Sequence, residues 1–192
     1  MTLLDENAFG LLVSFYDLET VEYSLPPDEF TTRCSEFRSL ALATAAEAPL
    51  GSGATILDLG HALYFEIGDG DQRVDPVSWL KALRATLAER EFAVVAVLSH
   101  GGRWVVESGP PDLPVVEPLA GGEYLLISAS RSSEPLRRAL YAETACHGTD
   151  GNDGWGPGLY VDTEAVEALG KSLKNAPTPL ISAGATFYRI GR

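Results

Sequence analysis

Short apolar runs alternate along the chain with segments of helical periodicity, and Gly- and Pro-containing turns separate them. Residues 8–16 form an apolar run of strand length. Residues 27–29, Pro-Asp-Glu, then suit the first turn of a helix, because proline fits there and carboxylates meet the positive end of the helix dipole. One apolar face follows at helical spacing, made of Phe30, Cys34, Phe37 and Ala41. The sequence therefore predicts a strand followed by a helix that ends near residues 48–53.

A pair of strands and a second helix are predicted next. Residues 54–67 are typical of two short strands on either side of Gly60-His61. Asp75 can cap a helix that has Pro76 in its first turn. A buried stripe of Trp79, Leu80, Leu83 and Leu87 supports that helix.

The strongest hairpin signal lies in the middle of the chain. Residues 93–99 and 104–107 are mostly apolar, and the segment between them contains Gly101-Gly102. A Gly-Gly pair permits the positive φ angles that a tight two-residue turn requires. We therefore expect two strands here, with His100 opposite Arg103.

The C-terminal part continues the alternation. Residues 123–128 predict a strand, Ser133 can cap a helix, and residues 159–161 predict another strand. Asp162 or Thr163 can cap a last helix before a strand at residues 185–190. The predicted order along the chain is β-α-β-β-α-β-β-β-α-β-α-β.

This order predicts an α+β fold, with a mixed, mostly antiparallel sheet and about four helices. We expect residues 1–192 to form a single α+β domain. A proline-rich stretch divides the pattern, so two subdomains joined near residues 109–118 are the alternative.

The charge of the chain is strongly negative and unevenly distributed. There are 27 acidic residues against 14 Lys and Arg, a formal net charge of −13. Residues 1–96 contain 16 acids and 6 bases, and residues 97–192 contain 11 and 8. A field of this sign repels nucleic acid and anionic membranes, and it favours basic partners. A solvated acidic surface that serves only solubility is the simpler interpretation.

Cysteine content and the N-terminus favour a cytoplasmic location. Cys34 and Cys146 lie far apart and suggest neither a disulfide framework nor a CxxC site. The first residues are acidic where a signal peptide is basic, and no apolar segment approaches the roughly 18 residues that span a bilayer. We expect a cytoplasmic protein that has no membrane or nucleic-acid partner, in an oligomeric state that the sequence does not predict.

The sequence predicts no metal site, no cofactor and no catalytic residue. The three histidines, His61, His100 and His147, occupy separate turn-like contexts without the spacing of a zinc site. The acidic loops 69–75 and 150–154 offer oxygen ligands, but neither satisfies the EF-hand pattern, and ordinary turn chemistry explains both.

The glycine-rich segment 148–158 is the most unusual in composition. It lacks the Lys and Ser/Thr of a P-loop, and its aspartates would repel phosphate. Trp155 could anchor a partner there, or it could be a tucked-in residue of a surface connection.

These observations favour a non-enzymatic acidic interaction protein over an enzyme. The acidic N-terminal half motivates binding to a basic protein partner. In class, though in no individual residue, the chain resembles bacterial immunity or accessory proteins. The candidate partner-binding residues are Asp17, Glu19, Glu22 and Trp155.

The alternative is a small-molecule-binding domain or an enzyme. Its pocket would lie near His61, His100, Arg103 and Cys146, with an imidazole able to activate the thiol. A buried structural thiol is the competing interpretation of Cys146.

Overall fold

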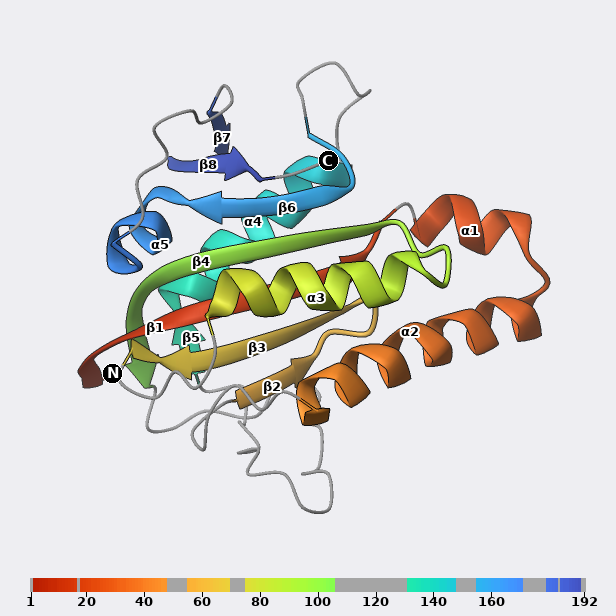
Figure 1. Cartoon of the computed structure of the whole chain (residues 1–192), viewed down its shortest axis with the longest axis horizontal. Helices are drawn as coiled ribbons and strands as arrows, with labels where there is room; N and C mark the ends of the chain where they lie inside the picture. Colours follow the sequence, from red (N-terminus) through yellow and green to blue (C-terminus); the bar gives the residue numbers. More distant parts are fainter. Residues whose placement is uncertain are drawn as a thin grey trace.

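The computed structural model describes residues 2–16, 18–47, 55–69, 75–105, 131–147, 155–170, 179–182 and 184–190 (Figure 1). Within these ranges the strands are β1 (Thr2–Phe15), β2 (Thr55–Asp58), β3 (Ala62–Gly68), β4 (Val94–Val105), β5 (Arg131–Ser133), β6 (Gly158–Asp162), β7 (Leu180–Ser182) and β8 (Ala185–Arg189). The helices are α1 (Leu18–Ser24), α2 (Pro27–Glu47), α3 (Pro76–Ala88), α4 (Glu134–His147) and α5 (Thr163–Ala168).

The strands form one sheet in the order β2-β3-β1-β4-β6-β8-β7, with β5 paired to β4. The long strand β1 runs antiparallel to both β3 and β4, while β4 and β6 are parallel. The remaining pairings between described strands are antiparallel. The predicted α+β fold with a mixed, mostly antiparallel sheet is therefore confirmed, with five described helices instead of about four.

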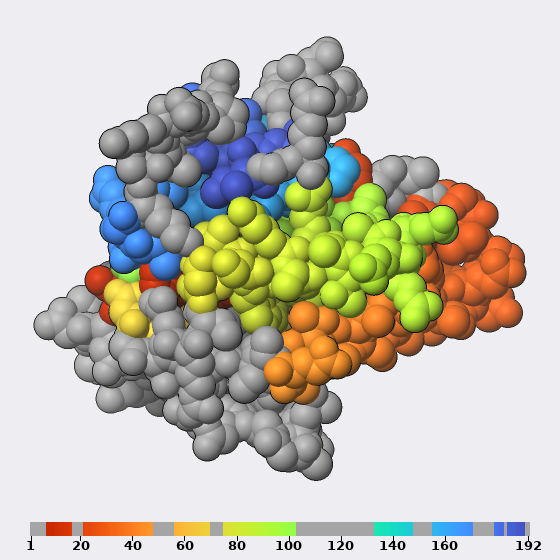
Figure 2. All heavy atoms as spheres, in the orientation of Figure 1, coloured from red at the N-terminus to blue at the C-terminus, as the bar shows by residue number. Residues whose placement is uncertain are grey.

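The two faces of the sheet are covered by different helices. In Figure 1, α2 and α3 lie in front of the sheet and α4 lies behind it. As spheres, α2 and α3 cover most of the middle strands from the front (Figure 2). Side chains alternate along β1 between the faces, since Leu11 and Val13 join the core under α2 and α3, and Leu12 joins the core under α4. The sheet thus carries a separate hydrophobic core on each face.

Several predicted helix starts are confirmed. The side chain of Asp75 accepts a hydrogen bond from the Val77 amide at 3.3 Å and caps α3. Asp162 caps α5 in the same way through the Ala165 amide. Helix α2 begins at Pro27, within its predicted opening segment.

The predicted hairpin at Gly101-Gly102 is wrong. Strand β4 continues through both glycines, because β1 pairs with β4 at both positions. Ala8 lies opposite Gly101 and Asn7 lies opposite Gly102. A Cβ atom at Gly101 would lie 3.0 Å from a carboxylate oxygen of Glu134, so the position favours glycine through crowding. A long-range strand pairing has overridden a local turn signal.

The proline-rich segment 109–118, the predicted strand 123–128 and most of the glycine-rich loop lie outside the described residues. Among the helices that are described, none has the length and apolar character needed to cross a bilayer.

Candidate functional site

The first turn of α4 is fixed against the back of the sheet. Ser133 Oγ accepts a hydrogen bond from the Leu136 amide at 3.1 Å, and this bond caps the helix as the sequence predicts. Ser99 Oγ on β4 donates to the Pro135 carbonyl at 2.7 Å. At Gly10 a Cβ atom would lie 2.8 Å from Pro135 Cβ, so only glycine lets β1 approach this closely. The side chains of the next turn of α4 are therefore held in defined positions.

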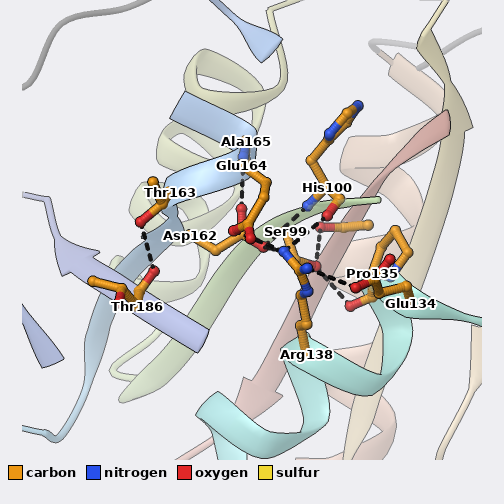
Figure 3. Close-up of polar contacts among 11 residues, drawn as sticks. Ser99, His100, Glu134, Pro135, Arg138, Asp162, Thr163, Glu164, Ala165 and Thr186 are labelled. Atoms are coloured by element: carbon orange, nitrogen blue, oxygen red, sulfur yellow. Dashed lines mark hydrogen bonds and ion pairs between the residues drawn. The ribbon is translucent and has the colours of Figure 1, made fainter. Parts of the chain in front are cut away.

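Arg138, one turn along α4, lies among three carboxylates (Figure 3). Its Nη2 donates to Glu134 Oε1 at 2.6 Å. Its Nη1 lies 2.7 Å from Glu164 Oε2 and 3.5 Å from Asp162 Oδ2. The side chain is 18% exposed. Burial disfavours the charged guanidinium, but these three anions outweigh it and raise the pKa of Arg138.

Asp162 is the most deeply buried member of this group. Its carboxylate is inaccessible to solvent and accepts hydrogen bonds from the Ala165 amide at 2.6 Å and the His100 amide at 3.2 Å. Burial raises the pKa of Asp162 to about 6, and the negative charge of Glu164 acts in the same direction. The two amides and Arg138 lower it only in part. Asp162 thereby connects β4, β6, α4 and α5.

The carboxylate of Glu164 has fewer hydrogen bonds than that of Asp162. Its Oε2 atom is buried without a hydrogen-bond donor, because the contact with Arg138 Nη1 lies outside hydrogen-bond geometry. Overall its side chain is 43% exposed. The residue before it, Thr163, donates through Oγ1 to the Thr186 carbonyl at 3.3 Å and so ties α5 to β8.

A pocket opens beside Arg138, with a volume of about 370 Å³. We call it the α4 pocket; its lining residues are Glu134, Arg137, Arg138, Tyr141, Glu164, Gly184 and Ala185. Two guanidinium groups in one concave, polar site are suited to phosphate oxygens, which arginine binds in a bidentate manner. Arg137 is exposed, whereas Arg138 is engaged with the carboxylates described above. The α4 pocket can therefore bind an anion, with its own carboxylates as competitors.

At the C-terminal end of α4, one carboxylate is surrounded by basic side chains instead of one arginine by carboxylates. Glu143 is buried, and its Oε1 lies 2.9 Å from His147 Nε2 and 3.4 Å from His61 Nε2. The ring of Tyr16 stacks on His147 at a centroid distance of 5.3 Å. This Glu143 cluster joins the end of β1, the turn between β2 and β3, and the last turn of α4.

The titration of this cluster is set by its contacts. Burial alone would raise the pKa of Glu143, but hydrogen bonds from His147 and His61 outweigh it and lower the value to about 2. The hydrogen bond to Glu143 raises the pKa of His61 above 6.5. In the part of the chain that the structure describes, no three His, Cys, Asp or Glu side chains are grouped so as to hold a metal ion.

The residues of the predicted histidine and cysteine pocket have separate partners. His61 contacts Glu143, whereas His100 Nε2 lies 2.9 Å from Asp69 Oδ1. Burial raises the pKa of Cys146 to about 12, which removes the thiolate at neutral pH. Arg103 belongs to β4, and its side chain lies outside the described residues.

The predicted partner-binding residues are placed unevenly. Glu22 is exposed on α1. Trp155 is buried, and its ring packs 5.1 Å from the ring of Tyr160. Asp17 and the side chain of Glu19 lie outside the described residues.

Sequence reasoning missed the Arg138 cluster, which consists of Arg138 with Glu134, Asp162 and Glu164. The spacing of Glu134 and Arg138, four residues apart on a predicted helix, signals an ion pair on one helix face. Nothing in the sequence signals that Glu164 reaches the same guanidinium, because that contact depends on the parallel pairing of β4 and β6.

The chain matches known proteins in structure but not in sequence. No protein-family model matches the chain, and no curated protein matches it in sequence. The adenylyl cyclase CyaB from P. aeruginosa matches with a TM-score of 0.63 at 9% identity, over 100% of this chain and 97% of that one.

Two guanylyl cyclase domains match similarly. The domain of RhGC from Catenaria anguillulae, solved with GTP, gives a TM-score of 0.59 at 10% identity over 97% of both chains. The domain of RhoGC from Blastocladiella emersonii, described as a non-canonical dimer, gives 0.60 at 10% identity over 97% of both chains. These matches correct the expectation of a non-enzymatic protein that docks a basic partner, because the fold of this chain is that of nucleotide cyclase domains.

Proposed function

We propose that this chain is a nucleotide cyclase-type domain that binds a purine nucleoside triphosphate and converts it to a cyclic nucleotide. The observation that carries the proposal is the fold match, which extends over nearly the whole chain and nearly the whole of each cyclase domain. The matched structures include both adenylyl and guanylyl cyclases, so ATP and GTP are the two substrates to test.

The α4 pocket is the proposed site for the phosphates. Cyclisation joins the 3′-oxygen of the ribose to the α-phosphorus and releases pyrophosphate, so negative charge must be stabilised on the phosphate oxygens. Guanidinium groups do this when they are positioned in advance. Arg137 and Arg138 are the cations that line the pocket, and the contacts of Arg138 with Glu134 and Asp162 position its guanidinium in advance.

A cyclase assay tests the proposal directly. The protein is incubated with ATP or GTP and either Mg²⁺ or Mn²⁺, and the cyclic product is identified by mass spectrometry. We expect a cyclic nucleotide from one of the two substrates, and a loss of roughly 100-fold in rate in Arg138→Gln. The matched control is Arg84→Gln on α3, which lies on the opposite face of the sheet and should change the rate by less than about twofold.

Two further results decide the proposal. If neither ATP nor GTP yields a cyclic product and neither binds, the proposed function is wrong. Binding without turnover would limit the function to nucleotide recognition. We measure unfolding of Arg138→Gln in parallel, so that a loss of activity is interpreted only for folded protein.

The proposed partner is a second copy of the chain, since one matched domain is described as dimeric. Analytical ultracentrifugation with and without nucleotide tests this assembly. A cytoplasmic location stays a prediction, which fractionation of the producing cells tests.

A further inference from the structure

The α4 pocket contains a competitor for its own ligand. We propose that Glu164 is a competing anion that occupies Arg138 in the free protein and must turn away before the pocket accepts a phosphate-type anion. The inference deepens the proposed function, on which it rests for the identity of the natural ligand. Its physical basis is a difference between the three carboxylates around Arg138.

Two of the three carboxylates cannot leave easily. Asp162 is inaccessible to solvent and is held by two backbone amides, so moving it would break the cap of α5. Glu134 makes a hydrogen bond of 2.6 Å with Arg138 Nη2 from one turn earlier on the same helix. Both carboxylates therefore stay with Arg138 when a ligand arrives.

The side chain of Glu164 is more exposed and less strongly held than those of Asp162 and Glu134. Its Oε2 contacts Arg138 Nη1 at 2.7 Å but lies outside hydrogen-bond geometry, and it has no other hydrogen-bond donor. The side chain is 43% exposed, so rotation moves the carboxylate into water with little loss of packing. An anion that forms two good hydrogen bonds with the guanidinium would replace an ion pair that includes no hydrogen bond.

The movement needs no change in the backbone. Asp162 caps α5 on one side of Glu164, and Thr163 donates to the Thr186 carbonyl of β8. These contacts, drawn in Figure 3, fix the first turn of α5. Only the side chain of Glu164 then has to rotate. Rotation frees the side of Arg138 Nη1 that Glu164 occupies, while the same nitrogen keeps its contacts with the His100 carbonyl at 3.4 Å and Asp162 Oδ2 at 3.5 Å. The freed side lies in a pocket that Arg138 and the exposed Arg137 both line.

The test uses inorganic pyrophosphate as the probe, because it presents phosphate oxygens without a base or a sugar. Calorimetric titration is carried out on the full chain, on Glu164→Gln and on Glu167→Gln. Glu167 is exposed on the same short helix, so its substitution removes one negative charge without touching Arg138. We expect Glu164→Gln to bind pyrophosphate about tenfold more tightly than the natural chain, and Glu167→Gln to change affinity by less than about twofold.

A double variant assigns the gain to the pocket. Adding Arg138→Lys to Glu164→Gln should abolish most of the gain, because lysine offers no planar fork to the anion. A gain that survives this change places the binding elsewhere and overturns the proposal. Equal affinities in Glu164→Gln and Glu167→Gln, or no binding in any variant, also overturn it.

The two proposals fail in different ways. If no cyclic nucleotide forms but Glu164→Gln still gains affinity for pyrophosphate, the cyclase function is wrong and the role of Glu164 stands. If a cyclic nucleotide forms but Glu164→Gln shows no gain, the role of Glu164 is wrong. Unfolding curves of each variant confirm that the protein is folded at the temperature of the titration.

Discussion

The two ends of α4 carry ion clusters of opposite composition. Near its start, one arginine is surrounded by the carboxylates of Glu134, Asp162 and Glu164. Near its end, one buried carboxylate, Glu143, is held between two histidines. The first cluster has an excess of negative charge at neutral pH, whereas the second has an excess of hydrogen-bond donors.

The two clusters differ in how completely their buried carboxylate is compensated, and only the first adjoins the proposed ligand pocket. In the Glu143 cluster the buried group has all the partners it needs, and its pKa falls to about 2. In the Arg138 cluster a buried carboxylate is under-compensated, and the pKa of Asp162 rises to about 6. Incomplete compensation of a buried charge beside a polar pocket is typical of functional sites.

The largest expected effect is on stability when Arg138 is removed. Arg138→Ala leaves the inaccessible carboxylate of Asp162 beside two other carboxylates without a cation, so we expect a loss of about 3–5 kcal/mol in the free energy of unfolding. Urea unfolding at pH 7 measures it. Arg138→Lys keeps the charge and should lose less. A loss below about 1 kcal/mol in Arg138→Ala would show that the carboxylates do not depend on the arginine.

The second effect is a pH dependence that belongs to Asp162. Its pKa in the folded protein, about 6, lies above the ordinary value of 3.8, so the folded state takes up a proton. The contribution of Asp162 to stability is therefore greatest below about pH 4, and it falls by up to roughly 3 kcal/mol as the pH rises to about 6. Asp162→Asn removes this dependence while keeping a capping side chain.

Unfolding of the natural chain and of Asp162→Asn is compared from pH 4 to pH 7. The stability of the natural chain relative to the variant should decline across this range. A difference that is independent of pH, or one that grows with pH, contradicts the shift.

The helix start at Asp162 shows how far the sequence leads. An acidic residue before a helical segment predicts a cap, and the cap is present. The same local reasoning fails at Gly101-Gly102, because the pairing of β4 with β1 involves residues far away in the sequence. Local signals predicted the α+β class and most helix starts, and they could not predict which strands pair.

The site depended almost entirely on such distant contacts. His61 was correctly placed at a turn, but its partner Glu143 comes from α4, which follows it in the chain after three further described strands. Glu164 reaches Arg138 only because β6 lies parallel to β4. The net charge of the chain carried no information about either cluster, because both depend on individual carboxylates and their burial.

A smaller effect is expected when the carboxylate of the second cluster is neutralised. We expect Glu143→Gln to lower the free energy of unfolding by only about 1–2 kcal/mol at pH 6, because His61 is 41% exposed and water screens its interaction with Glu143. The folded pKa of Glu143 lies below its ordinary value of 4.5, so its contribution is present above about pH 4.5 and is lost as the pH falls toward 2. This pH dependence has the opposite sign to that of Asp162. Acid unfolding followed by circular dichroism should show the natural chain losing its advantage over Glu143→Gln between these pH values, and an advantage that persists at pH 2 would contradict the lowered pKa.

The smallest effects on stability are expected when His61 or His147 is replaced alone. His61 and His147 share one oxygen of Glu143, so each can compensate in part when the other is replaced by glutamine. Because the pKa of His61 is raised, its contribution is present below about pH 6.5 and fades as the pH rises above that value. We expect each single variant to lose about 0.5 kcal/mol at pH 6, and the double variant to lose more than the sum, since it leaves Glu143 buried without either partner. A double-mutant cycle by urea unfolding measures this coupling, and strictly additive losses would mean that the two imidazoles do not share the carboxylate.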